Sequence, residues 1–153
     1  MIRPAIALQN SQNGSEEHEA FYFIANYHAL IGVRDAAKLK KDTLEMAAAF
    51  LAFGFDPTKG ALFLQSDIPE IPELSWILSC LASFGDLTRA HAYKAAKDEG
   101  REGEINLGVF SYPVLMTADI LAYDSDVVPV GQDQTQHLEM TRQLAQRFNH
   151  YYG

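Results

Sequence analysis

A short apolar segment, residues 127–130, that runs directly into a glycine and three polar residues constrains this chain most. It reads Val-Val-Pro-Val, and Gly-Gln-Asp-Gln follows at 131–134 before a helix-like stretch to Asn149. The apolar run predicts a buried strand, and the polar residues after it predict the start of a helix. This junction is typical of a small-molecule site, because glycine permits close backbone approach and a helix N-terminus offers unpaired N–H groups.

The apolar helix predicted before that strand places three candidate binding side chains on one face. Tyr112, Met116 and Asp119 are spaced by four and three residues, which brings them to the same side of a helix. Asp119 interrupts the apolar run 113–121, and a buried carboxylate is unfavourable unless another group pairs with it. Asp119 is therefore a candidate ligand-binding group, with a helix-end or salt-bridged carboxylate as the alternative.

Two earlier apolar runs predict further strands of a parallel sheet. Residues 21–25 form an aromatic and β-branched run, and residues 61–65, Ala-Leu-Phe-Leu-Gln, form a second apolar run. Asn26, Tyr27 and His28 follow the first of these runs. Polar residues at the carboxyl ends of parallel strands are where open α/β sheets hold their ligands.

Helical patterns separate the strands, which favours an α/β fold in one domain, residues 1–153. Asp35 is the predicted N-cap of a long helix through Phe53 that Gly54 ends. The charged, glycine-containing segment 97–104 predicts a mobile surface loop. The other predicted helices span residues 2–12, 73–84 and 86–96.

Composition and charge argue against several classes of protein. A net charge of −8 does not favour broad electrostatic binding to nucleic acid, although an RNA held at local basic spots stays open. No signal peptide opens the chain, and no apolar run reaches the roughly 20 residues of a membrane span. The single cysteine, Cys80, is expected to pack as a small hydrophobe in a reducing cytoplasm. The histidines show no metal-ligand spacing, so no metal site is predicted.

Two adjoining motifs resemble the tryptophanyl-tRNA synthetases, a class I family with a Rossmann catalytic domain. They are YPVLMTADIL at 112–121 and VPVGQDQTQHLEMTRQLAQRFN at 128–149. The resemblance extends back through RAHAYKAA, LFLQSDIPEIPEL and FYFIANYHAL, and so covers nearly the whole chain. It implies a Rossmann-like parallel sheet with flanking helices in a cytoplasmic protein.

The family activity that this resemblance implies is tryptophan–tRNA ligation. Such enzymes form an enzyme-bound tryptophanyl adenylate from L-tryptophan and ATP, then transfer the tryptophanyl group to tRNA(Trp). ATP is a substrate that carries its own Mg²⁺, and no protein-bound metal is implied. The family also forms homodimers through the catalytic domain.

The resemblance assigns the tryptophan side chain to residues of the two motifs. Asp119 would accept a hydrogen bond from the indole N–H. A buried acceptor left unpaired penalises amino acids that lack this donor. Met116 and Val130 would line the indole slot, and His28 would lie close to the pocket.

The remaining assignments concern the α-ammonium group and ATP. Tyr112 and Gln134 would hold the α-ammonium. Gly131 and Asp133 match positions that meet adenosine, with Asp133 toward the ribose hydroxyls. Lys94 matches a lysine near the ATP phosphates, where a cation offsets developing charge.

The chain also departs from the family pattern at both ends. Ile2-Arg3-Pro4-Ala5 resembles the helix just after the HIGH-like ATP motif, and residue 153 precedes the expected KMSKS-like loop. Little or no aminoacylation is therefore expected from this chain alone.

The family strand before that motif would lie between the strands at 21–25 and 127–130. Its absence predicts an unfilled slot, a rearranged sheet or a strand borrowed from a partner. Asn26 stands where relatives are expected to carry aspartate.

Taken singly, several of these residues have ordinary structural interpretations. Met116 is typical of core filling, His28 of a hydrogen-bonded structural histidine, and Lys94 of a solvated lysine. His91 and His137 are interpreted as surface or packing residues. A second function also stays open, namely a non-catalytic tryptophan-binding or dimerisation module that uses the apolar stretch 74–84.

Overall fold

Two units of contiguous sequence make up the chain, residues 1–68 and residues 69–153. The computed structural model describes residues 2–10, 19–100, 103 and 105–153, with the side chains at positions 91, 92, 96 and 133 outside that description. The predicted loop at 97–104 and the end of the predicted helix at 2–12 fall partly on residues that are not described.

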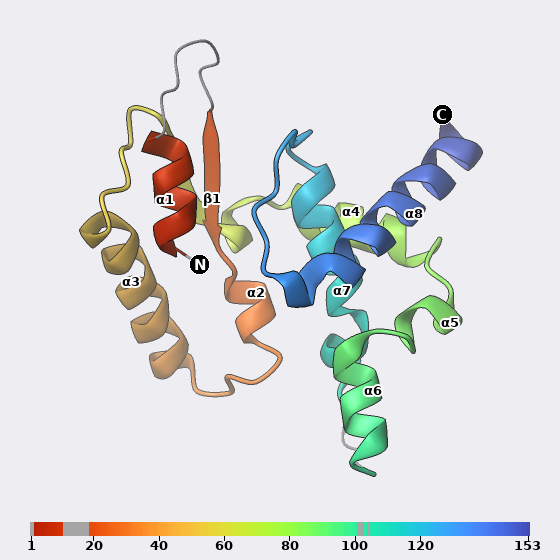
Figure 1. Cartoon of the computed structure of the whole chain (residues 1–153). Coiled ribbons are helices and arrows are strands. Elements are labelled where there is room, and N and C mark those ends of the chain that lie inside the picture. The colour runs from red at the N-terminus through yellow and green to blue at the C-terminus, as the bar shows by residue number, and fades with distance from the viewer. Residues whose placement is uncertain (1, 11–18, 101–102, 104) are drawn as a thin grey trace. The chain divides into compact units, whose positions relative to one another are not determined.

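The first unit is built around two short parallel strands (Figure 1). Strands β1 and β2 pair from Ala20 opposite Gly60 to Ile24 opposite Leu64. Gly60 is required there, since a Cβ at that position would lie 2.0 Å from the Ala20 carbonyl oxygen. The elements are α1 (Ile2–Asn10), β1 (Ala20–Ile24), α2 (Asn26–Ala29), α3 (Ala36–Ala52), β2 (Gly60–Leu64) and the 3₁₀ turn η1 (Gln65–Asp67).

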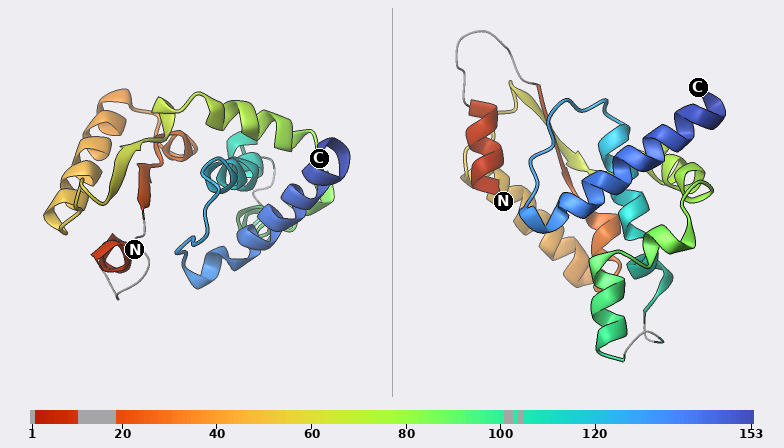
Figure 2. Two further views of the ribbon diagram at one scale, coloured as in Figure 1. Left: turned by 90° about the horizontal axis from the view of Figure 1, so that it is seen from above. Right: turned by 45° about the vertical axis from the view of Figure 1, so that its right-hand side comes forward.

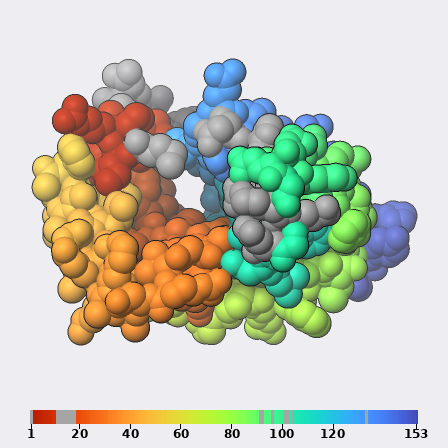
Figure 3. Space-filling model, turned by 90° about the horizontal axis from the view of Figure 1, so that it is seen from below, coloured from red at the N-terminus to blue at the C-terminus, as the bar shows by residue number. Residues whose placement is uncertain are grey.

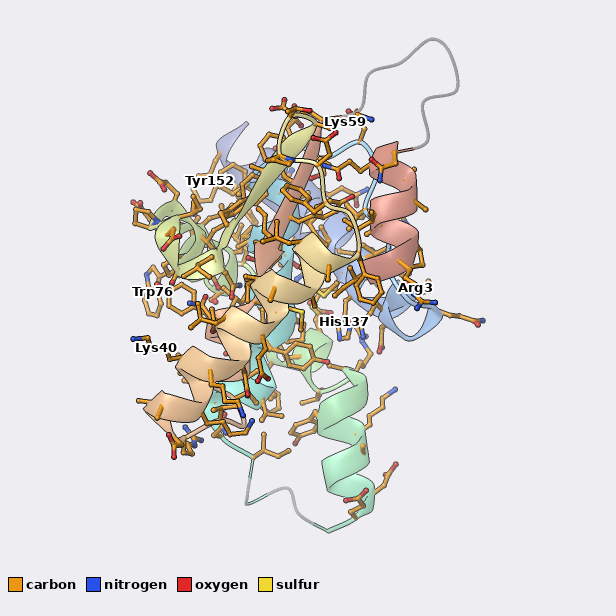
Figure 4. The ribbon with its side chains drawn as sticks, turned by 90° about the vertical axis from the view of Figure 1, so that its left-hand side faces the viewer. Arg3, Lys40, Lys59, Trp76, His137 and Tyr152 are labelled. Atoms are coloured by element: carbon orange, nitrogen blue, oxygen red, sulfur yellow. The ribbon has the colours of Figure 1, made fainter. Side chains whose placement is uncertain are left out.

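Helices α1 and α3 cover one face of the strand pair through Tyr22. The Tyr22 ring lies 5.6 Å from that of Phe50 on α3, and its hydroxyl donates to the Ala5 carbonyl on α1 over 2.7 Å. Gln9 then fixes α1 to the loop before β2 by exchanging two hydrogen bonds of 3.1 Å with the Asp56 backbone. The outer side of α3 is exposed, as Lys40 shows in Figure 4 and the orange to yellow surface in Figure 3.

The predicted boundaries of α3 are confirmed. The Asp35 side chain accepts a hydrogen bond from the Lys38 backbone N–H at 2.9 Å, as an N-cap does. Gly54 has a φ of +90°, the left-handed backbone that favours glycine after a helix.

The second unit is helical, with α7 at its centre. In Figure 2, α7 lies between α4 and α8. Its elements are α4 (Glu70–Ser79), α5 (Phe84–Leu87), α6 (His91–Asp98), α7 (Leu107–Leu121), the 3₁₀ turn η3 (Gln132–Gln134) and α8 (Thr135–Tyr152). Its buried apolar side chains include Ile71, Leu78, Val114, Ala118, Met140 and Leu144.

The helices predicted at 73–84 and 86–96 differ from those observed. Helix α4 begins at Glu70 and ends at Ser79, and the second predicted helix is divided into α5 and α6. Ser83 is the reason for the new start, because its hydroxyl accepts from the Asp86 backbone N–H at 3.1 Å in a capping box. Periodicity detects the apolar face and does not detect a cap within it.

The predicted strand at 127–130 is wrong for this structure. These residues form an irregular segment between α7 and η3, and Val127 is exposed. A strand requires a neighbour for its backbone N–H and C=O groups. Among the described residues the sheet contains β1 and β2 alone, with no third strand beside 127–130.

A charged cluster around the buried Asp86 joins α8 to α5 and the turn before it. Arg147 donates to the Asp86 carboxylate over 2.7 Å and to the Leu81 carbonyl over 3.1 Å. Arg89 forms a second ion pair with Asp86. Burial alone would raise the pKa of Asp86, yet hydrogen bonding from Ser83 and the Arg147 guanidinium hold that pKa below its ordinary value.

Three further predictions concern the packing of Cys80, membrane-spanning helices and metal sites. Cys80 is exposed at the end of α4, so its predicted packing as a buried hydrophobe is wrong. Over the described ranges, no helix combines the length and apolar character that membrane crossing requires. In the same residues no group of three or more His, Cys, Asp or Glu side chains is arranged to hold a metal ion.

Candidate functional site in the second unit

The candidate site begins on α7, where three of the predicted side chains lie on successive turns. Asp119 is buried, at 5% exposure, while Tyr112 and Met116 are half-buried. The carboxylate of Asp119 acts on a neighbouring phenol, since the pKa of Tyr123 is raised by burial first and then by the charges of Asp119 and Glu70. A buried acidic group therefore lies near the C-terminal end of α7.

A chain of side-chain hydrogen bonds connects α7 to the start of α8. The Tyr112 hydroxyl lies 2.8 Å from Nε2 of His137, and Nδ1 of His137 lies 2.8 Å from Oε1 of Gln134. The Tyr112 and His137 rings also meet edge to face, with centroids 5.2 Å apart. Two residues predicted to act together, Tyr112 and Gln134, are thus joined through a third.

His137 is the residue that sequence reasoning missed. It is 2% exposed, and its two ring nitrogens contact Tyr112 and Gln134, so it is a hydrogen-bonded group within the site. Of the two interpretations of His137, a surface residue or a packing residue, the first is wrong because the side chain is buried. A signal was available, since residues 134 and 137 are three apart and share a helix face.

A buried pair of hydroxyl groups continues the polar contact between α7 and α8. Thr117 Oγ1 lies 3.1 Å from Thr141 Oγ1. Each hydroxyl also lies within hydrogen-bond distance of a carbonyl of its own helix, Thr117 of Pro113 and Thr141 of His137. Because each hydroxyl has one hydrogen, one of the two donates to the other and the second donates to its helix carbonyl. These bonds satisfy both hydroxyls in the core and fix the register of the two helices.

The segment before α8 supplies backbone and side chains at the predicted junction. Val130 and Gly131 are half-buried, and Gly131 has an extended backbone with a φ of −69°. The Gln134 backbone N–H bonds to the Gly131 carbonyl over 2.9 Å, closing the η3 turn. The predicted ATP contact of Asp133 involves a side chain outside the described set.

Lys94 lies on α6 and forms no ion pair with an acidic side chain among the described residues. Its side chain is exposed. The helix is anchored beside it, because the Tyr93 ring meets Phe110 of α7 edge to face at 5.5 Å. This places a solvent-accessible cation on a helix that packs against α7.

His28 belongs to the first unit, at the carboxyl end of β1, where it is half-buried on α2. Its neighbour Asn26 has a clear structural role. The Asn26 amide donates to the Ser66 hydroxyl at 2.7 Å, and its oxygen accepts from the Ser66 backbone N–H at 3.1 Å. Gln65, which is 1% exposed, accepts from the Tyr27 N–H at 3.0 Å. These bonds hold the ends of β1 and β2 together.

Comparison with known proteins decides the family. The family model for tRNA synthetases class I (W and Y) matches residues 1–152. This chain belongs to that family. Within it, the similarity is to tryptophanyl-tRNA synthetases, as the two motifs at 112–121 and 128–149 predict.

Curated relatives support the same placement. The chain is 52% identical to the tryptophan–tRNA ligases of Xanthomonas campestris pv. campestris and Pseudomonas putida over 158 aligned residues. Each alignment covers 99% of this chain but 36% and 34% of the relative, respectively. The chain therefore spans about a third of the length of these relatives.

Solved structures agree with the sequence comparison. Tryptophanyl-tRNA synthetase from Campylobacter jejuni matches with a TM-score of 0.89 and 46% identity, covering 99% of this chain and 45% of that one. A structure of the Campylobacter jejuni enzyme complexed with ADP and tryptophan matches with a TM-score of 0.87, 45% identity and the same coverage. The α/β character predicted from sequence is confirmed at this level, with a two-stranded parallel sheet and helices.

Proposed function

We propose that this chain forms part of a tryptophan–tRNA ligase catalytic domain and binds L-tryptophan on α7 and the start of α8. The observation that carries the proposal is the buried Asp119 together with the Tyr112–His137–Gln134 chain. These groups occur in a sequence 45% identical to a synthetase described as complexed with ADP and tryptophan.

At the indole end, Asp119 accepts the hydrogen bond of the indole N–H. Phenylalanine has no donor at that position, and leaving a buried carboxylate without it is unfavourable. Met116 and Val130, both half-buried, supply apolar walls for the ring. His28 is the remaining residue of the predicted tryptophan set, and it belongs to the first unit.

At the amino-acid end, Tyr112 and Gln134 accept hydrogen bonds from the α-ammonium. The two side chains are already held in one hydrogen-bonded chain, so little side-chain freedom is lost on binding. Preorganised oxygen atoms around a cation are an efficient way to bind it.

ATP would meet the same unit at three predicted positions. Gly131 and Asp133 face adenosine, and Lys94 offsets the charge of the phosphates, with Mg²⁺ carried by ATP. The exposed side chain of Lys94 suits a group that reaches toward a phosphate. Transfer of the tryptophanyl group to tRNA(Trp) would follow in the intact enzyme.

The proposed fold is a Rossmann-like catalytic domain without its first strand, with residues 1–153 as one domain. Segment 127–130 has no strand neighbour among the described residues, which accounts for its irregular backbone. Homodimer formation through the second unit is part of the same proposal.

Calorimetric titration tests the tryptophan site directly. The full chain should bind L-tryptophan and discriminate against L-tyrosine, and Asp119→Asn should weaken L-tryptophan binding about tenfold through loss of a charged hydrogen-bond acceptor. Asp126→Asn is the matched control, since Asp126 is an exposed carboxylate in the segment after α7. No saturable L-tryptophan binding by the folded wild-type chain would refute the proposal.

A non-catalytic tryptophan-binding or dimerisation module is the second candidate. Large apolar side chains are exposed in the predicted dimer stretch, with Trp76 at 73% and Phe84 at 69% (Trp76 in Figure 4). ATP-dependent pyrophosphate exchange by the chain alone would exclude this candidate. Dimers in sedimentation velocity without any exchange activity would support it.

A further inference from the structure

His137 connects the two proposed α-ammonium ligands, although it was not among the predicted site residues. Its imidazole (labelled in Figure 4) is buried at 2% exposure and lies 2.8 Å from both Tyr112 Oη and Gln134 Oε1. Side chains from two helices therefore meet at this ring.

The hydrogen positions in this chain follow from donor and acceptor chemistry. Oε1 of Gln134 is a carbonyl oxygen and can only accept, so Nδ1 of His137 carries the hydrogen. In a neutral imidazole the other nitrogen is then an acceptor. With the ring neutral, the Tyr112 hydroxyl donates its hydrogen to Nε2.

This arrangement sets the polarity that the site presents to a ligand. A hydroxyl oxygen whose hydrogen is directed at His137 offers lone pairs to other groups, and a carbonyl oxygen has two. Both oxygens are then suited to accept from an N–H donor. An ammonium group, which has three donors and no acceptor, matches this pair of oxygens.

We propose that His137 is a positioning residue for the α-ammonium end of the amino-acid site. It holds the Nδ1–H tautomer, and by doing so turns the Tyr112 hydroxyl and the Gln134 carbonyl into acceptors for that cation. The neutral ring achieves this without placing a like charge beside the ammonium. The proposal rests on the proposed tryptophan-binding function and adds a residue to it.

Two conservative substitutions separate the roles of the ring nitrogens. The amide of His137→Asn reaches the position of Nδ1 and can donate to Gln134, but it leaves Tyr112 without its acceptor. The longer His137→Gln reaches the position of Nε2 and can accept from Tyr112. His137→Leu removes both contacts, and His150→Leu is the control, an exposed histidine near the end of the same helix.

Calorimetry with two ligands distinguishes positioning from a merely structural role. L-tryptophan carries the α-ammonium, whereas indole-3-propionate keeps the ring and carboxylate and lacks that cation. We expect His137→Leu to weaken L-tryptophan binding about tenfold, the equivalent of one hydrogen bond of about 1.4 kcal/mol, and to leave indole-3-propionate binding within about twofold. His137→Gln should restore part of the L-tryptophan affinity, and His150→Leu should match the wild type.

The tautomer can be measured without any ligand. Long-range ¹⁵N–¹H correlation spectra of the ¹⁵N-labelled chain at neutral pH should show His137 protonated at Nδ1 and bare at Nε2. The opposite tautomer, or an imidazolium, would overturn the hydrogen assignment on which the inference depends.

The binding results separate failure of this inference from failure of the proposed function. If the wild-type chain does not bind L-tryptophan, the proposed function fails and this inference fails with it. If the wild type binds and His137→Leu weakens both ligands equally, or neither, the tryptophan site stands and the positioning role of His137 is refuted.

Discussion

The two units each contain a hydrogen-bonded polar cluster, and the clusters differ in what they bind together. In the first unit, Asn26 and Gln65 bond to backbone N–H groups of Ser66 and Tyr27, which lie some 40 positions away in sequence. In the second unit, Tyr112, His137 and Gln134 bond through side-chain atoms.

We use the word bracket for a polar cluster that holds segments of the fold together, and this difference distinguishes a bracket from the proposed binding site. Loss of the acceptor of a buried backbone N–H destabilises the fold, because the position of the N–H is fixed by the backbone and it cannot turn to another acceptor. Side chains that bond to one another leave the backbone in place, and the helices α7 and α8 are held by apolar packing. In the proposed site, a cluster of the second kind keeps its own hydrogen bonds and accepts further ones from a ligand through the same oxygen atoms.

The largest expected effect comes from a charged bracket within the second unit. Asp86→Asn should destabilise the fold by about 2 kcal/mol, less than the 3–5 kcal/mol for a fully buried pair because the Arg147 side chain is 36% exposed. Urea denaturation followed by far-UV circular dichroism measures the change. Asp42→Asn, in the exposed pair with Lys38, is the control and should leave the midpoint unchanged.

The pH dependence of the same bracket has a defined sign. Because the pKa of Asp86 is lowered in the folded state, its contribution is present above the unfolded value of about 3.9 and is lost as pH falls through the folded pKa. Wild-type stability should therefore decrease below about pH 4, and Asp86→Asn should show a shallower decrease. Parallel curves for the two proteins would contradict this assignment.

The next largest effect is expected at the neutral bracket of the first unit. Gln65→Leu keeps much of the side-chain volume but leaves the Tyr27 N–H without its acceptor, which should destabilise the fold by about 1.5 kcal/mol. Binding of L-tryptophan at saturating concentration should persist wherever the protein is folded. Unchanged stability of Gln65→Leu would mean that water replaces the amide and that the bracket is not needed.

The secondary structure of the first unit was more predictable from sequence than that of segment 127–130. The strands at 21–25 and 61–65 and the capped helix after Asp35 follow from period, β-branching and cap chemistry, and are confirmed within one residue of their observed ends. The strand at 127–130 was wrong because period reports the side chains of a segment and not whether a neighbouring strand exists.

The side-chain partners were the least predictable part. Asp119 and Tyr112 could be selected because a charged or aromatic residue in an apolar helix is conspicuous. His137 and Asn26 resemble ordinary surface residues, and their roles depend on contacts with positions 25 and 40 residues away. Non-local pairing of this kind is set by tertiary packing, which local pattern does not encode.

A smaller effect on stability is expected when Asn26, in the bracket of the first unit, is replaced by a residue that keeps the hydrogen-bond geometry. Asn26→Asp retains the oxygen that accepts from the Ser66 N–H, and the Ser66 hydroxyl can rotate to donate to the other oxygen. Stability at neutral pH should change by less than about 0.5 kcal/mol, whereas Asn26→Ala should lose about 1–2 kcal/mol. Equal losses in both variants, measured by urea denaturation, would show that the amide N–H₂ is essential.

A small stability effect, paired with a clear effect on binding, is expected at Tyr112. Tyr112→Phe keeps the ring against His137 and removes one side-chain hydrogen bond, so stability should fall by no more than about 1 kcal/mol. L-tryptophan affinity should fall about tenfold, and indole-3-propionate affinity should stay within about twofold. The opposite pattern, a large loss of stability with unchanged discrimination between the two ligands, would make this cluster a second bracket. The contrast between the two units would then disappear, because both clusters would stabilise the fold and neither would bind the α-ammonium.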